Sequence, residues 1–138
     1  MGGGFSSGPR TILKVLFDTQ ALVLWIAGVP LPGKVEALAH ENVAIYLRVL
    51  APWELLIKSQ FRGIGFTMEH FWRAFHEIGA TLLSLEGTHL EAYAELPALA
   101  NHRDPFDRML IAQAKAEGLT IVSGNSRFRS YGVPVIWS

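Results

Sequence analysis

Short apolar runs alternate along this chain with longer segments of helical character. The short runs, rich in β-branched residues, predict strands at residues 12–17, 43–50, 81–85, 119–123 and 133–137. The longer segments, ended by glycine or proline, predict helices at residues 19–27, 34–40, 52–62, 67–78, 88–96 and 105–117. Because strands alternate with helices, the pattern predicts an α/β fold, a three-layer α/β/α sandwich around a mostly parallel five-stranded sheet.

Local signals mark several of the expected helix starts and one sheet edge. Pro52 suits the first turn of a helix, Thr67 can cap the next helix, and Thr88 with Glu91 has the spacing of a capping box. Pro134 lies within the last predicted strand, and proline favours edge strands because it has no N–H to donate. We therefore expect the last strand at an edge of the sheet.

The composition narrows the class of protein. The chain has 138 residues, which is about one domain at the usual ~100–200 residues each. Its 12 Lys and Arg balance 12 Asp and Glu, which argues against a globally basic nucleic-acid coat and a polybasic membrane binder. Hydrophobic residues make up 50% and charged residues 17%, the opposite of a disordered chain.

Two absences narrow the chemistry and the location. The chain has no cysteine, which excludes a disulfide scaffold, a Cys-ligated zinc site and a thiol nucleophile. No apolar run reaches the ~18 residues of a membrane span, so we expect no membrane partner and a cytoplasmic location. Residues 1–10 lack the apolar core of a signal peptide and are interpreted as a flexible tail or a cloning remnant. Residues 11–138 then form a single domain.

All three aspartates of the chain lie where a helix is expected to begin. Asp104 fits the cap of the helix at 105–117, and Asp107 falls in its first turn. Asp18 directly follows the first strand, and ligands bind beyond the carboxyl ends of strands in such sheets. Asp107 begins an almost wholly apolar helix, where a buried carboxylate needs a cation or hydrogen-bond donors. A capping role and a functional role stay open for each aspartate.

Glu54 is the one acidic group in an apolar stretch, residues 52–58. Lys58 follows four residues later, which is the spacing of a helical ion pair. Glu54 therefore either pairs with Lys58 or binds a metal ion, and pairing is the commoner outcome for an isolated glutamate.

Carboxylates from separate elements are expected to meet at one end of the parallel sheet. Without cysteine, and without two histidines at metal-ligand spacing, such carboxylates favour hard cations, Mg²⁺ or Mn²⁺. Magnesium held by few carboxylates, with waters retained, is typical of phosphoryl-transfer sites. The histidines are interpreted as surface groups or core groups with satisfied hydrogen bonds: residues 40, 70, 76, 89 and 102.

Several segments together carry a family resemblance: residues 16–22 (LFDTQAL), 53–58 (WELLIK), 102–114 (HRDPFDRMLIAQA), 117–122 (EGLTIV) and 128–137 (FRSYGVPVIW). They resemble the PIN domain and, within that family, the VapC-type toxins of bacterial toxin–antitoxin pairs. The resemblance covers the chain from about residue 12 to its end. Its most specific segment is the one at 102–114.

The resemblance implies a sheet in the order 3-2-1-4-5 and a Mg²⁺- or Mn²⁺-dependent endoribonuclease. By position it implies that Asp18, Glu54 and Asp107 are catalytic metal ligands. It places Asp104 close to them, also as a catalytic residue, and implies that Thr19 supports the Asp18 carboxylate through its hydroxyl or its backbone. It further implies an RNA substrate and an antitoxin partner. The high apolar fraction fits both a groove for the antitoxin and a homodimer face.

Four arginines flank the expected site: Arg103, Arg108, Arg127 and Arg129. They are candidates for contacts with RNA phosphates although the net charge is zero. For any single one of them, a solvated surface position is the preferred interpretation.

Three positions depart from the family pattern. Asn125 stands where many relatives have an aspartate, Gln20 where a histidine is frequent, and Ala51 where a serine is usual. Asn125 can support a metal-bound water but brings no charge. This opens the alternative of a PIN-like fold with weak or no nuclease activity that acts as a binding or regulatory partner. A receiver-like or nucleotide-binding domain is a third alternative, but no Gly-rich phosphate loop follows any predicted strand.

Overall fold

A five-stranded sheet forms the centre of the computed structural model, which describes residues 12–40, 42–62, 65–99 and 102–137. The strands are β1 (Leu13–Phe17), β2 (Val43–Arg48), β3 (Thr81–Leu83), β4 (Thr120–Val122) and β5 (Val135–Ile136). They lie in the order β3-β2-β1-β4-β5, and every neighbouring pair is parallel. The predicted fold class and the strand order 3-2-1-4-5 are confirmed.

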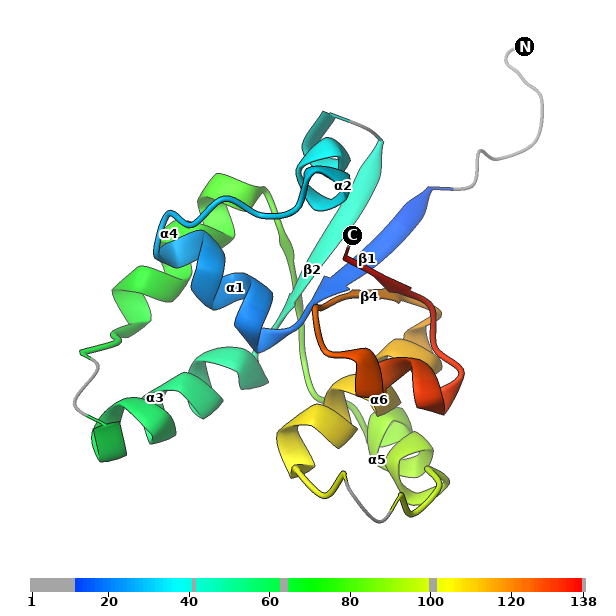
Figure 1. Ribbon diagram of the computed structural model, residues 1–138. Helices are drawn as coiled ribbons and strands as arrows, with labels where there is room; N and C mark the ends of the chain where they lie inside the picture. Colours follow the sequence, from blue (N-terminus) through cyan, green and yellow to red (C-terminus); the bar gives the residue numbers. More distant parts are fainter. Residues whose placement is uncertain (1–11, 41, 63–64, 100–101, 138) are drawn as a thin grey trace, which may run out of the picture.

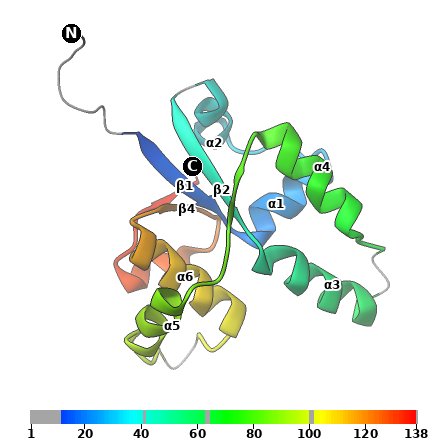
Figure 2. The same cartoon turned by 180° about the vertical axis from the view of Figure 1, so that it is seen from behind.

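Helices connect the strands and cover both faces of the sheet (Figures 1 and 2). The α-helices are α1 (Thr19–Ile26), α2 (Gly33–Glu36), α3 (Leu50–Arg62), α4 (Met68–Ile78), α5 (Gly87–Ala94) and α6 (Pro105–Glu117). Two 3₁₀ helices are η2 (Ala37–His40) and η3 (Ser126–Tyr131). Figure 1 shows α1, α2, α3 and α4 on one side of the sheet and α5 and α6 on the other.

The alternation of side chains along β1 explains the two hydrophobic layers. Val15 and Phe17 point into the core beneath α1 and α4, whereas Leu16 belongs to the core beneath α6 and η3. All three residues are buried, because a central strand of a parallel sheet is covered on both faces.

Three local predictions hold and one is wrong. Thr67 caps α4, as expected. Pro52 lies in the first turn of α3, although that helix already begins at Leu50. The last strand lies at a sheet edge, directly after Pro134. The capping box expected from Thr88 and Glu91 does not form, because α5 begins earlier, with Glu86 as its cap. The Glu86 N–H donates to Nδ1 of His89, a fully buried side chain. The 3₁₀ helix η3 was not expected from the sequence.

Two expectations concern the ends of the chain and the membrane. The predicted tail at residues 1–10 lies outside the described residues. The assignment of residues 11–138 to one domain stays a prediction. None of the described helices is both long enough and apolar enough to cross a bilayer.

The parallel sheet brings three chain segments together at the carboxyl ends of its strands. β1 ends before Asp18, β2 ends at Arg48, and β4 ends before Ser123. The Asp18 N–H donates to the carbonyl of Val122 at 3.0 Å, which joins the ends of β1 and β4. Side chains from these segments therefore share the space beyond the carboxyl ends of the strands.

Candidate active site

A cavity of about 570 Å³ opens beyond the carboxyl ends of β1 and β4. Four carboxylates line it: Asp18, Glu54, Asp104 and Asp107. They come from the start of α1, from α3 and from the start of α6. The structure thus brings all four predicted acidic residues to one cavity, although they come from three separate parts of the sequence.

Asp18 both caps a helix and lines the cavity. Its Oδ1 accepts a hydrogen bond from the Ala21 N–H at 2.7 Å, which satisfies a free donor at the start of α1. The residue is only 5% exposed. The capping role is therefore confirmed, and the functional role stays a prediction for a carboxylate that also lines the cavity.

Burial raises the pKa of Asp18 from its ordinary value of 3.8 to about 6. The negative charge of Asp107 adds to the rise. Hydrogen bonds from Ser123 and the Ala21 backbone, and the positive charge of Arg48, oppose it. The ionised Asp18 carboxylate is therefore held in surroundings that disfavour its charge.

Asp104 and Asp107 occupy the first turn of α6. Asp104 Oδ1 accepts from the N–H groups of Phe106 at 2.8 Å and Asp107 at 3.2 Å, so Asp104 is the helix cap, as predicted. Burial raises the pKa of Asp107, and the charges of Asp104 and Glu54 raise it further, whereas a hydrogen bond from His102 lowers it. Burial and negative neighbours therefore raise the pKa of both Asp18 and Asp107.

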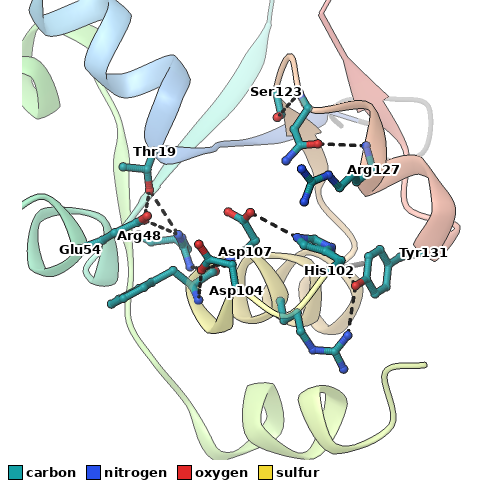
Figure 3. A network of polar contacts seen from close by, with 12 residues as sticks. Thr19, Arg48, Glu54, His102, Asp104, Asp107, Ser123, Arg127 and Tyr131 are labelled. Carbon is teal, nitrogen blue, oxygen red and sulfur yellow. Dashed lines mark hydrogen bonds and ion pairs between the residues drawn. The ribbon is translucent and has the colours of Figure 1, made fainter. Parts of the chain in front are cut away.

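A chain of hydrogen bonds runs from Asp107 away from the cavity (Figure 3). Asp107 Oδ2 lies 3.3 Å from His102 Nε2, and His102 Nδ1 lies 2.8 Å from the Tyr131 hydroxyl. That hydroxyl accepts from Arg108 Nη1 at 3.1 Å. An ionised Asp107 carboxylate can only accept, so His102 Nε2–H donates to it, and the Tyr131 O–H, which accepts from Arg108, is then the donor to His102 Nδ1. We call these residues, His102, Tyr131 and Arg108, the Asp107 relay.

The sequence interpretation of the histidines missed this role of His102. The residue is 2% exposed and its hydrogen bonds are satisfied, as a core histidine requires. Its partner, however, is a candidate ligand. The only signal in the sequence was its place five residues before Asp107, in the most specific segment of the family resemblance.

Glu54 is held by cations and by a hydroxyl. Its Oε2 lies 2.6 Å from Lys58 Nζ, which confirms the predicted helical pair. Its Oε1 accepts from the Thr19 hydroxyl at 2.7 Å and lies 4.0 Å from Arg48 Nη2. The Thr19 hydroxyl therefore supports Glu54 and not Asp18, which corrects that part of the expectation from the family pattern.

Arg48 is the second residue that the sequence interpretation missed. It ends β2, and its side chain is 1% exposed. Nη1 donates to the carbonyl of Phe106 at 3.2 Å, and Nη2 donates to the Thr19 hydroxyl at 3.5 Å. Burial lowers the pKa of Arg48 to about 10, so the guanidinium remains charged at neutral pH. A lone arginine inside the apolar run 43–50 was the available signal.

Asn125 lines the cavity but uses its side chain locally. Its Oδ1 accepts from the Arg127 N–H at 3.0 Å and so caps η3. Of the other two departures from the family pattern, Gln20 lines the cavity and Ala51 is buried in the core. The amide of Asn125 therefore adds a polar wall to the site without adding charge.

The four candidate arginines are not gathered around the acidic cavity. Arg103 and Arg108 line a separate cavity of about 460 Å³, and Arg108 also donates to the carbonyl of Pro97 at 2.9 Å. Arg127 extends from η3 toward the carboxylates in Figure 3. Arg129 is an exposed residue of η3. RNA contacts by these side chains stay predictions.

The donor set fits a hard divalent cation held by few protein ligands. Within the described part of the chain, no group of three or more His, Cys, Asp or Glu side chains forms a ready-made metal site. Two carboxylates, Asp18 and Asp107, instead share a cavity and have pKa values raised by burial and by negative neighbours. Mg²⁺ is commonly bound by one or two carboxylates and several waters. A cation between these two groups would relieve their repulsion.

Comparison with protein families agrees with this geometry. The model of the PIN domain matches residues 15–134, so the chain belongs to the PIN-domain family. PIN domains are generally nucleases and typically use divalent metal ions. No curated protein matches the chain by sequence.

Solved structures share the fold at low sequence identity. One is VapBC2 from Rickettsia felis bound to a DNA fragment from their promoter, with a TM-score of 0.67, 17% identity, and coverage of 91% of this chain and 100% of that chain. DNA-bound VapBC from Salmonella typhimurium gives a TM-score of 0.66 and 18% identity, with coverage of 91% and 98%. FitAcB from Neisseria gonorrhoeae gives a TM-score of 0.59 and 17% identity, with coverage of 88% of this chain and 96% of that chain. These likenesses show a common fold.

Proposed function

We propose that this chain is a Mg²⁺- or Mn²⁺-dependent endoribonuclease, the toxin of a VapBC-type toxin–antitoxin pair that acts in the cytoplasm. The observation that carries the proposal is the meeting of Asp18 and Asp107 on one cavity, both with raised pKa values, in a member of the PIN-domain family. Such a pair favours a bound cation, and metal-assisted hydrolysis of a phosphodiester uses one.

In this proposal each acidic residue has a separate task. Asp18 and Asp107 hold the ion directly. Glu54, which the family pattern implies as a third ligand, is proposed to support the cavity wall instead, because Lys58 and the Thr19 hydroxyl already bind its oxygens. Asp104, exposed at the mouth, orients a water or a group bound to the ion. When bound, a divalent ion makes a water more acidic and stabilises negative charge on the phosphate.

The Asp107 relay keeps the Asp107 carboxylate oriented in this mechanism. Because His102 is buried and bound on both sides, its Nε2–H points at one carboxylate oxygen and leaves the other for the ion. Arg103, Arg108, Arg127 and Arg129 are the proposed contacts for RNA phosphates.

The proposal includes an antitoxin partner. The VapBC and FitAcB structures that share the fold are named as two-component assemblies, which supports such a partner here. A smaller apolar cavity of about 240 Å³, with Trp25, Leu31 and Val35 in its wall, is the proposed place where an apolar side chain of an antitoxin helix inserts. A homodimer face is an additional proposal for the exposed apolar residues.

A direct cleavage assay tests the function. The purified chain is incubated with a defined RNA, and with DNA of the same sequence, in Mg²⁺, Mn²⁺ or EDTA. We expect cuts within the RNA that require the divalent ion, that disappear in Asp107→Asn and that leave the DNA intact. Cleavage that persists in EDTA, or in the folded variant, would refute the metal-dependent mechanism.

Asn125 favours one second candidate, a PIN-like fold with weak or no nuclease activity that acts as a binding or regulatory partner. This side chain carries no charge, and its oxygen accepts a hydrogen bond from the Arg127 N–H and so caps η3. Asn125→Asp separates the two candidates. A large gain in Mn²⁺ affinity and in cleavage would favour the second candidate for the parent chain, and no change would favour the ribonuclease.

A further inference from the structure

Both oxygens of Glu54 already have close partners. Lys58 Nζ lies 2.6 Å from Oε2, and the Thr19 hydroxyl lies 2.7 Å from Oε1. Arg48 Nη2 lies 4.0 Å from the same Oε1. The residue is 3% exposed, so these partners replace water around its charge. A metal ion at Glu54 would compete with these partners for the lone pairs of the carboxylate.

Arg48 is fixed in this position by its surroundings. Its guanidinium spans the end of β2, the Thr19 hydroxyl on α1 and the Phe106 carbonyl on α6. Its Nε is buried without a hydrogen-bond partner among the described residues. An arginine accepts such an incomplete set of partners only where nearby negative charge compensates for lost hydration. Figure 3 shows Arg48 beside Glu54 and Asp104.

We propose that Arg48, assisted by Lys58, is the resident counter-ion of Glu54, and that the cavity therefore takes a single divalent cation, at Asp18 and Asp107. The inference rests on the proposed function and assigns the number of ions at that site. Arg48 acts through Glu54 and is a positioning residue, because it does not line the cavity itself.

Charge balance supports a single ion. The four carboxylates of the cavity carry at most four negative charges, and Arg48 with Lys58 offsets two of them, before Arg127 is counted. One divalent cation is then enough to neutralise the charge that remains. A second divalent ion would leave a partly buried site with net positive charge while Arg48 stays in place, and it would compete with Lys58 and Thr19 for the oxygens of Glu54.

Titration of the metal-free chain with Mn²⁺, followed by electron paramagnetic resonance of the free ion, tests the proposal. The chains compared are the parent, Arg48→Met, Arg48→Lys and Lys58→Met. Lys34→Met is the matched control, because it removes one positive charge from exposed α2. Lys58 is 44% exposed, so Lys58→Met is expected to fold even where Arg48→Met does not.

We expect one Mn²⁺ per parent chain, one in Arg48→Lys and Lys34→Met, and a second bound ion in Arg48→Met. Lys58→Met frees Oε2 and should also bind a second ion, more weakly. If Arg48→Met folds only in the presence of Mn²⁺, the ion is replacing the lost charge, which supports the proposal.

Two comparable Mn²⁺ sites in the parent would overturn the inference and leave the proposed nuclease intact. An unchanged single site in both Arg48→Met and Lys58→Met would also overturn it, and if Arg48→Met does not fold at all, Lys58→Met decides alone. The absence of Mn²⁺ binding from every chain refutes the proposed metal site itself, and this inference with it.

Discussion

The carboxylates in the two halves of the acidic cavity have different partners for their negative charge. On the Glu54 side, a lysine and a buried arginine form ion pairs with the carboxylate. On the side of Asp18 and Asp107, hydrogen bonds come from the Ala21 N–H, Ser123 and His102, and burial raises the pKa of both aspartates. Arg127, an exposed residue of η3, extends toward this side.

This difference separates the carboxylate that stabilises the fold from those that are available for a ligand. Removing a paired charge leaves its partners buried and unpaired, which destabilises a protein. Removing a charge that is disfavoured where it lies has the opposite effect. The two halves should therefore respond to neutral substitutions with opposite signs.

The largest expected effect is on catalysis. Asp107→Asn should lower the rate of RNA cleavage by at least about a hundredfold, because even an outer partner of a metal ligand is commonly worth 10–100-fold. Thermal unfolding and circular dichroism check that the variant is folded. Wild-type cleavage by the folded variant would contradict a direct role for Asp107.

The second-largest effect concerns Glu54, the carboxylate that is paired with Arg48 and Lys58. Glu54→Gln should lower the free energy of unfolding by roughly 3–5 kcal/mol, the usual result of breaking a buried ion pair, because Arg48 loses its charged partner. Urea unfolding of the metal-free chain measures it. Glu91→Gln, on an exposed position of α5, is the control and should change stability little. Equal stability of the two variants would mean that Glu54 is not the anchor of Arg48.

Asp18→Asn should stabilise the metal-free chain at neutral pH. The folded-state pKa of Asp18 is about 6 and the ordinary value is 3.8, so the folded protein binds this proton more tightly. The contribution to stability is fully present below pH 3.8 and is lost as the pH rises through 6. The loss amounts to about 3 kcal/mol, from ~1.4 kcal/mol per unit of pKa.

The measurement is unfolding of the parent and Asp18→Asn between pH 4 and 8, compared pairwise so that other titrating groups cancel. The advantage of the variant should be near zero at the acid end and reach its plateau above pH 6. Because asparagine also caps helices well, loss of the cap does not mask the effect. A variant that is less stable than the parent at pH 8 would show that Asp18 is already neutralised in the folded chain.

The smallest effect concerns the Asp107 relay. Tyr131→Phe removes the hydroxyl between Arg108 and His102 and should cost about 1–2 kcal/mol of stability, since a buried nitrogen loses its partner. Mn²⁺ affinity should fall by about tenfold, as for other outer partners of metal ligands. Tyr93→Phe, whose ring also lies against Arg108, is the matched control. Equal Mn²⁺ affinities in both variants would limit the relay to a structural role.

The sequence predicts the framework of this site better than its electrostatics. Asp18 and Asp107 lie at strand and helix ends that the hydrophobic pattern locates, and a parallel sheet brings such ends together. The burial of Arg48 depends on contacts with α1, α3 and α6 at once, which no local pattern reveals. The strand order came from the family resemblance and not from the pattern.

The capping of α5 and the role of His102 were missed for a similar reason. His89 binds the Glu86 N–H on one side and Glu117 of α6, at 2.7 Å, on the other, so a tertiary contact decides where the helix begins. The capping-box spacing at Thr88 and Glu91 contains no information about α6. The role of His102 likewise depends on its hydrogen bond with Tyr131, which lies 29 residues away.

Anomalous diffraction from a Mn²⁺-soaked crystal of the full chain tests the central claim most directly. We predict one manganese peak per chain, within bonding distance of the Asp18 and Asp107 carboxylates, with Glu54 still paired to Arg48 and Lys58. A peak bound to Glu54 with Arg48 displaced, or no peak in the cavity at saturating Mn²⁺, would contradict the account.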